Sequence, residues 1–114
     1  MERREYSRYL VSLEIEIQET GSSFALRGNT TDVSLGGCYV ATIFPLAVGS
    51  EIHFKLRVAD EDITARGSVQ TSHPSVGMGI RFIGLADKDR RRLDKYLLDS
   101  EATLPERMLA SYLR

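Results

Sequence analysis

The chain has 114 residues, of which 42% are hydrophobic and 27% are charged, and this is the size and composition of one ordinary globular domain. Its formal net charge is −1, with 15 basic and 16 acidic residues, so it lacks the broad positive field of a protein that binds extended nucleic acid. Cys38 is the single cysteine, which excludes an internal disulfide and a cysteine-based metal cage.

The first half of the chain alternates apolar and polar side chains in short stretches separated by turn-forming residues. Residues 9–17 predict a strand, because every second side chain is apolar: Val11, Leu13, Ile15 and Ile17. Residues 21–23 predict a turn, which precedes a second strand near residues 24–29. Residues 32–37 are again turn formers, and residues 38–42 predict a third, short strand.

The second half continues the same pattern and predicts three more strands, over residues 51–58, 63–73 and 76–83. A loop at residues 45–50 and polar turns at residues 60–62 and 74–75 separate them. Six short strands joined by tight turns would leave exposed edges in an open sheet, and closure removes those edges. We therefore expect a mainly β fold, a six-stranded antiparallel β-barrel.

After Gly84 the apolar period changes from that of a strand to that of a helix. Asp87 is a candidate cap for a C-terminal α-helix that begins near Lys88 and has Leu93, Tyr96 and Leu97 as its apolar stripe. The helix also carries three consecutive arginines, Arg90, Arg91 and Arg92. We interpret them as a solvated face paired with neighbouring aspartates (Asp87, Asp89 and Asp94) and not as a second anion site.

The sequence predicts one domain followed by a tail. Residues 1–100 form the barrel domain with an N-terminal ligand-binding segment and the C-terminal helix, and residues 101–114 form a helical tail beyond the main helix. The N-terminus lacks the apolar core of a signal peptide, and no apolar run approaches the roughly 20 residues of a membrane span. We therefore expect a cytoplasmic protein without a membrane span.

Three arginines, Arg3, Arg4 and Arg8, lie within six residues just before the first predicted strand. The planar guanidinium fork of arginine matches phosphate oxygens, and its flat face stacks on bases. Taken alone, this cluster is better explained as solvating charges on a terminus, because Glu2 and Glu5 are interleaved with it.

A second candidate element is the turn Asp32-Val33-Ser34-Leu35-Gly36-Gly37. Asp and Ser side chains bond local backbone groups in tight turns, and glycine allows positive φ and close backbone approach. Taken alone, this element describes a well-made turn.

The two elements together, Arg4-x-x-x-Arg8 followed by Asp32-x-Ser34-x-x-Gly37, resemble the PilZ domain, the bacterial receptor module for cyclic di-GMP. The resemblance covers about residues 2–98. It extends to Cys38-Tyr39-Val40 after the glycines and to Gly77-Met-Gly-Ile-Arg-Phe82 in the last predicted strand.

The resemblance implies roles for particular residues. Arg4 and Arg8 clamp phosphates and guanine, and Asp32 and Ser34 contact a guanine, whose N1 and N2 hydrogens suit the Asp32 carboxylate. Gly37 keeps the turn open for a base, with Gly36 beside it, and Arg81 is a secondary candidate near the ligand. Arg3 occupies the place that the family associates with an intercalated pair of ligands, which favours two cyclic di-GMP molecules per chain. The implied ligand-binding residues are thus Arg3, Arg4, Arg8, Asp32, Ser34, Gly36, Gly37 and Arg81.

The expected function is a cyclic di-GMP-binding receptor or adaptor that changes conformation on ligand binding and relays the signal to an unknown protein partner. We hypothesise that the ligand folds residues 2–8 onto the barrel face near Ser34 and Gly37, because a segment that orders around a ligand changes the surface offered to partners. The alternative is a ligand-free protein-interaction module on the same fold. A homodimer fits either, with Tyr96, Leu97 and the tail residues Met108, Leu109 and Leu113 packing on the barrel or on a second copy.

Catalysis finds little support in the sequence. Asp32, Ser34 and His73 could be imagined as a triad, but no Gly-x-Ser-x-Gly nucleophile turn is present and nothing positions them. His53 and His73 are expected to be ordinary surface histidines, and no cluster has zinc-ligand spacing. We expect no enzyme activity, no metal and no cofactor besides the ligand.

Overall fold

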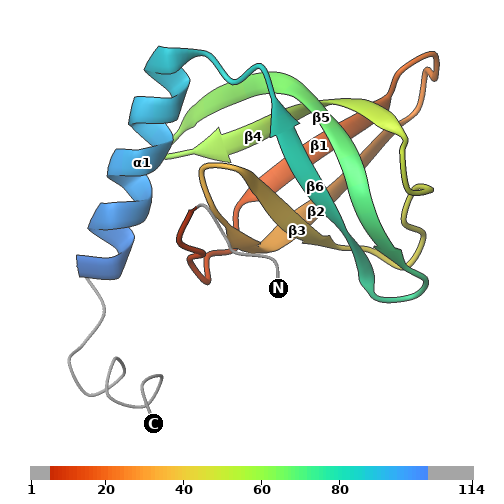
Figure 1. The fold of residues 1–114 in the computed structure, drawn as a ribbon, viewed down its shortest axis with the longest axis horizontal. Coiled ribbons are helices and arrows are strands. Elements are labelled where there is room, and N and C mark those ends of the chain that lie inside the picture. Colours follow the sequence, from red (N-terminus) through yellow and green to blue (C-terminus); the bar gives the residue numbers. More distant parts are fainter. Residues whose placement is uncertain (1–5, 103–114) are drawn as a thin grey trace, which may run out of the picture.

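The fold is a closed barrel of six antiparallel strands with one helix after it, as predicted (Figure 1). It comes from a computed structural model, which describes residues 6–102. The elements are β1 (Glu14–Glu19), β2 (Ala25–Val33), β3 (Gly37–Ala41), β4 (Glu51–Val58), β5 (Glu61–His73), β6 (Gly77–Ile83) and α1 (Asp87–Ala102). Around the barrel the strand order is β1-β2-β3-β6-β5-β4, and β4 pairs again with β1.

The barrel interior is filled by the apolar side chains that alternate along each strand. Strand β4 shows the pattern most clearly, because its inward residues Ile52, Phe54, Leu56 and Val58 are buried and the residues between them are exposed. Helix α1 buries Leu93 and Leu97 in the same core and packs Tyr96 against it, as the predicted stripe requires. Leu97 and Tyr96 therefore dock on this chain's own barrel.

Several predicted boundaries were wrong by a few residues around the turns. Strand β1 begins at Glu14, although we expected residue 9, and β2 runs on through Asp32 and Val33, which we expected in a turn. The β2–β3 pairing shifts register between Thr30 and Asp32. Because of this bulge, pairing with β3 continues through Asp32 and Val33. The turn itself is therefore short and spans residues 34–36. Likewise, the β4–β5 hairpin turns at Ala59 and Asp60, both at positive φ, so Glu61 already belongs to β5.

The start of α1 also differs from the prediction. The backbone N–H of Arg90 donates to the carbonyl of Ala86 (2.8 Å), so Asp87 is the first helical residue and Ala86 precedes the helix. Asp87 and Asp89 instead lie in the first turn, where acidic side chains complement the helix dipole. Of the predicted helical tail, residues 101–114, the first two belong to α1, and residues 103–114 lie outside the described residues. Within residues 6–102, α1 is too short and too polar to cross a membrane.

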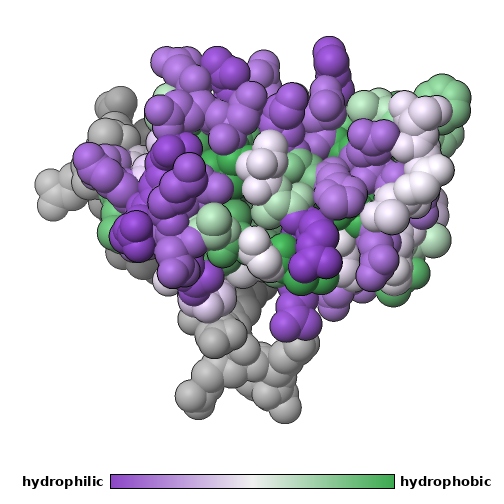
Figure 2. Space-filling model, turned by 90° about the horizontal axis from the view of Figure 1, so that it is seen from above, coloured by the Kyte–Doolittle hydropathy of each residue, from purple (hydrophilic) through white to green (hydrophobic). Residues whose placement is uncertain are grey.

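The two ends of the barrel carry different surfaces. The turn after β2, the start of α1 and the segment before β1 lie at one end, and the β1–β2, β3–β4 and β5–β6 connections lie at the other (Figure 1). Exposed apolar side chains gather on that second end, away from α1 (Figure 2). They are Phe24, Ile43, Phe44, Val48 and Val76, and we call this surface the apolar end.

Candidate ligand-binding site

The segment before β1 places Arg8 beside the end of β2. Tyr9 and Val33 form an isolated antiparallel bridge, in which each backbone N–H donates to the other's carbonyl at 2.9 Å. Because side chains alternate along an extended chain, the neighbours Arg8 and Asp32 project from the face opposite to the buried Val33. Their side chains form an ion pair with 3.7 Å between Nη1 and Oδ1. The backbone bridge thus brings the two predicted motifs together.

A buried threonine fixes the same segment further along the chain. The Thr30 hydroxyl donates to the carbonyl of Val11 (2.7 Å) and accepts the backbone N–H of Leu13 (2.9 Å). Both partners are backbone groups of the segment before β1, so one buried side chain satisfies a donor and an acceptor of that segment. Thr30 therefore holds the chain along β2 on its way from Arg8 into β1.

Ser34 organises the turn between β2 and β3. Its hydroxyl oxygen accepts the backbone N–H groups of Gly36 (3.1 Å) and Gly37 (3.2 Å), and its own N–H donates to the carbonyl of Gly37 (2.8 Å). The carbonyl of Gly36 accepts the N–H of Phe82 from β6 (2.9 Å). The side chain thus closes the turn locally, and the turn is joined to the neighbouring strand.

Gly36 and Gly37 are needed for close contact and not for a left-handed backbone, because neither has positive φ. A Cβ on Gly37 would lie 2.1 Å from the carbonyl oxygen of Ile80, so only glycine lets β3 approach β6 here. A Cβ on Gly36 would lie 2.9 Å from the ring of Tyr6. We expected Gly37 to keep the turn open for a base; in the structure its bare backbone faces β6.

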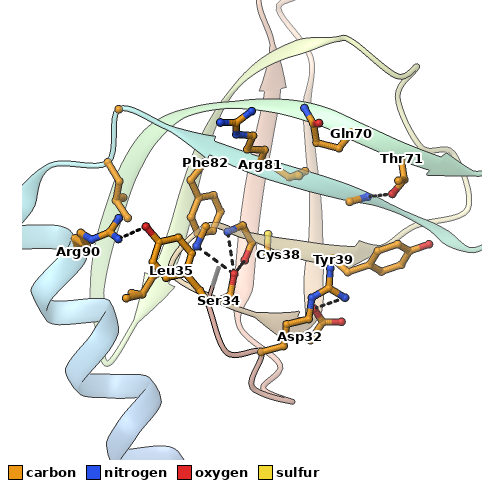
Figure 3. A pocket seen from close by; sticks show the side chains of 18 residues that line it. Asp32, Ser34, Leu35, Cys38, Tyr39, Gln70, Thr71, Arg81, Phe82 and Arg90 are labelled. Atoms are coloured by element: carbon orange, nitrogen blue, oxygen red, sulfur yellow. Dashed lines mark hydrogen bonds and ion pairs between the residues drawn. The ribbon is translucent and has the colours of Figure 1, made fainter. Parts of the chain in front are cut away.

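The segment before β1, the β2–β3 turn and β6 border one pocket of about 760 Å³ (Figure 3). The described site residues that the sequence predicted all line it: Arg8, Asp32, Ser34, Gly36, Gly37 and Arg81. Arg81 is exposed on β6, across the pocket from the ion pair of Arg8 with Asp32 (Figure 3). Arg3 and Arg4 lie outside the described residues.

The pocket also contains residues that the sequence did not indicate. Gln70 is the extra residue of a bulge in β5, where the pairing with β6 shifts between Val69 and Thr71. A bulge re-aims side chains next to a site, but it leaves no signal in the strand pattern. Tyr39 lines the pocket as well, and its hydroxyl lies 3.0 Å from Nδ1 of His73, which is exposed as expected.

We expected the three consecutive arginines of α1 to form one solvated face, but the structure places them in three different environments. Arg92 pairs with Glu61 (2.9 Å) and with Asp89 (3.6 Å), and Arg91 is exposed. Arg90 instead lines the pocket, and its Nη2 donates to the hydroxyl oxygen of Tyr6 (2.6 Å). Its guanidinium also lies over the Tyr6 ring, 4.9 Å from the ring centre. Successive helical residues point about 100° apart, which explains the three different environments.

Cys38 lies beneath the site and is buried. Burial raises the pKa of its thiol, and the nearby Asp32 carboxylate raises that pKa further. The thiol therefore stays protonated at neutral pH and is a poor nucleophile. Within residues 6–102, no group of three or more His, Cys, Asp or Glu side chains is arranged to hold a metal ion.

Comparisons with known proteins agree on the fold. The structure resembles the Bacillus subtilis inhibitor of motility MotI/DgrA, with a TM-score of 0.74 and 21% identity over 90% of this chain and 53% of that one. It resembles Escherichia coli YcgR in complex with c-di-GMP, with a TM-score of 0.72 and 19% identity over 99% and 51% of the chains. The PilZ domain of YcgR with c-di-GMP gives a TM-score of 0.71 and 16% identity over 89% and 93%.

The present chain therefore spans about half the length of MotI/DgrA and of YcgR. No curated protein matches it. The sequence model of the PilZ domain family matches residues 2–99, which include all six strands and most of α1. The chain therefore belongs to the PilZ domain family.

Proposed function

We propose that this domain is a non-enzymatic receptor for cyclic di-GMP, which it binds in the pocket between the N-terminal segment, the β2–β3 turn and β6. The observation that carries the proposal is the meeting of Arg8, Asp32 and Arg81 around one pocket of a PilZ domain. The PilZ domain of YcgR and the PlzA protein of Borreliella burgdorferi are solved with c-di-GMP and share this fold.

The size and charge of the pocket suit this ligand. A volume of about 760 Å³ falls within the usual range of small-molecule sites, about 300–1,000 Å³. Among the described residues that line it, three arginines (Arg8, Arg81 and Arg90) and one aspartate give three positive charges and one negative charge. The positive excess complements the two phosphodiester groups of cyclic di-GMP, each of which carries one negative charge.

Within this proposal Arg8 and Asp32 act as a pair. Nη1 of Arg8 lies 3.7 Å from Oδ1 of Asp32. The Asp32 side chain is 18% exposed, and the Arg8 side chain is 50% exposed. A pair of this length whose arginine is half exposed contributes little stability, so both groups can exchange partners at low cost. Asp32 then accepts the N1 and N2 hydrogens of a guanine, and Arg8 donates to a phosphate or to the guanine edge. Arg3 and Arg4 extend this cluster and favour two ligand molecules per chain.

The N-terminal segment is the proposed moving part, and the response passes to a protein partner in the cytoplasm. The contacts of Tyr6 with Gly36 and of Arg8 with Asp32 support the barrel face near the β2–β3 turn as the surface onto which residues 2–8 fold. We expect cyclic di-GMP to slow amide exchange in residues 2–8. Unchanged exchange throughout that segment, under conditions where the ligand is bound, contradicts the switch.

Calorimetric titration with cyclic di-GMP tests the receptor function. We expect saturable binding by the wild-type protein, no binding of GTP at the same concentration, and a loss of affinity in Arg8→Ala. Arg27→Ala is the matched control, because Arg27 is exposed, pairs with Glu16 and lies outside the pocket. The stoichiometry separates one ligand molecule per chain from two. Folded protein that gives no heat with cyclic di-GMP contradicts the proposal.

A second candidate function, a protein-interaction module, is favoured by the apolar end. The three connections that form it, residues 20–24, 42–50 and 74–76, contain no Asp, Glu, Lys or Arg. The N–H of Ser75 donates to the carbonyl of Ile43 (3.0 Å), so the second and third connections form one surface, on which Phe44 is 80% exposed. Exposed apolar patches of this kind mark interaction sites.

A second copy of the chain is the occupant that we propose for the apolar end. A two-fold contact places a surface against itself, and an uncharged surface then meets no like-charge repulsion. We expect Phe44→Ser to lower the dimer fraction in analytical ultracentrifugation, whereas Leu98→Ser, at a half-exposed position on α1, leaves it unchanged. A wild-type protein that is monomeric, or a dimer that Phe44→Ser leaves intact, contradicts this candidate.

A further inference from the structure

We propose that Arg90 of α1 is a ligand-binding residue of the pocket, that it contacts a phosphodiester group of the nucleotide, and that Tyr6 orients its guanidinium. This inference rests on the proposed function, because it concerns the same pocket and the same ligand. It adds a contact from the helix, outside the two sequence motifs of the barrel.

Arg90 is the arginine of α1 that both lines the pocket and lacks an ion pair with a carboxylate within residues 6–102. Arg92, two residues later, is paired with Glu61 and Asp89. Arg91, next in sequence, is exposed and does not line the pocket. Arg90 alone among the three faces the pocket, with a positive charge still available for an anion.

Tyr6 fixes the guanidinium of Arg90 by two contacts. Its hydroxyl accepts Nη2 at 2.6 Å, and its ring lies under the guanidinium, with 4.9 Å between the ring centre and Cζ. The ring in turn packs against Gly36, where a Cβ would be only 2.9 Å away. Once the N-terminal segment lies on the barrel, Tyr6 therefore holds the guanidinium in one plane and keeps its remaining N–H donors in a fixed direction.

The geometry favours phosphate over a base as the group that Arg90 contacts. Arginine has five N–H donors, and Tyr6 takes one of them while no carboxylate within residues 6–102 takes another. Because the charge is not neutralised, its strongest partner is an anion, and the anionic groups of a cyclic dinucleotide are its phosphodiesters. The Tyr6 ring covers one face of the guanidinium, so the phosphate approaches from the edge.

A contact from Arg90 links ligand occupancy to the helix. Arg90 precedes Leu93 by one helical turn and Leu97 by two, and the side chains of both leucines are buried in the barrel core. Tyr6 belongs to the segment that the proposed switch moves, and Gly36 belongs to the β2–β3 turn. A nucleotide bound by Arg90 therefore contacts the helix directly while it contacts the turn and the N-terminal segment.

The test is a calorimetric titration of cyclic di-GMP into wild-type protein and five variants, each checked for folding by its melting curve. We expect Arg90→Ala to weaken binding by about tenfold to a hundredfold, the loss of one charge-assisted hydrogen bond. Arg91→Ala removes the same charge one residue away and should leave the affinity within about twofold, since charge at the surface is screened. Arg90→Lys keeps the charge and should recover part of the loss.

Tyr6→Phe tests the positioning role separately, because it keeps the ring and removes the hydroxyl. We expect a smaller loss than in Arg90→Ala and no further loss in the double variant, since Tyr6 acts through Arg90. Equal losses in Arg90→Ala and Arg91→Ala, or wild-type affinity in Arg90→Ala, overturn the inference while the receptor function stands. A wild-type protein that binds no cyclic di-GMP overturns both.

Discussion

Gly36 and Gly37 stand next to each other in the β2–β3 turn, yet their missing side chains make room for different neighbours. At Gly37 the neighbour is the backbone carbonyl of Ile80, which can move only if β6 moves. At Gly36 it is the ring of Tyr6, which can tilt. The pattern Asp-x-Ser-x-x-Gly therefore requires glycine at its last position for the sake of the barrel, whether or not a ligand binds.

This difference predicts unequal effects on stability. Gly37→Ala should lower the free energy of unfolding by about 3 kcal/mol, because strand β3 must move away from β6. Gly36→Ala should change it by less than about 1 kcal/mol, because the ring gives way and the unfolded chain loses entropy. Urea unfolding of the two variants checks this, and equal losses contradict it.

Cys38 predicts a pH dependence of stability. Its pKa is raised in the folded protein by burial and by Asp32, so the folded protein keeps the thiol proton at a pH where the unfolded chain releases it. The stability that depends on this proton is fully present below the ordinary thiol pKa of about 8.5 and is lost as the pH rises above it. The loss approaches about 1.4 kcal/mol per pH unit.

Urea unfolding of wild-type protein and Cys38→Ala between neutral and alkaline pH measures this effect. The difference in unfolding free energy between the two proteins should be constant at neutral pH and should shrink above the ordinary thiol pKa. A difference that stays constant at alkaline pH contradicts it. The folded wild-type protein should also resist thiol reagents at neutral pH.

At the scale of elements, α1 is held to the barrel by two buried leucines one turn apart and by the ion pair of Arg92 with Glu61 of β5. Leu93→Ala or Leu97→Ala should each cost about 2–5 kcal/mol, since each leaves a cavity in the core. Leu98 is 49% exposed on the same helix, and Leu98→Ala should cost no more than about 1 kcal/mol. Thermal or urea unfolding compares them, and similar costs at positions 97 and 98 contradict the packing described.

The elements also show where sequence patterns lose accuracy. Strand β4 matches its predicted bounds, residues 51–58, because its inward and outward residues alternate without interruption. The end of β2 was harder to predict, because the strand contains a bulge that inserts one residue into the ladder. A bulge depends on the partner strand, and the partner is not visible in the local sequence.

At the scale of the whole molecule, a ligand that binds the folded protein alone stabilises it by mass action. At a cyclic di-GMP concentration of about 100 times Kd, the gain is about 2.7 kcal/mol, which corresponds to a melting temperature higher by on the order of 10 °C for a domain of this size. Differential scanning calorimetry measures this shift. Arg8→Ala should show almost none at the same ligand concentration, and an equal shift in both proteins contradicts the proposed site.

By itself, the sequence determined the mainly β class, the six strands, the apolar stripe of α1 and the resemblance to the PilZ family. These follow from local periodicity and from motif residues close together in the chain, which need no knowledge of distant contacts. It also indicated Arg8 and Asp32, although 24 positions separate them, through the motif pair and not through any sign of their contact.

Only the tertiary structure decided which side chains share the pocket. The bridge between Tyr9 and Val33 brings Arg8 to Asp32, and the closure of the barrel sets Arg81 and Gln70 across from them. Arg90 was predicted as part of a solvated face, because helical spacing tells which residues share a side and not what that side meets. Its contact with Tyr6, 84 residues earlier, depends on the docking of α1 against the barrel, and this long-range packing is what the local sequence does not encode.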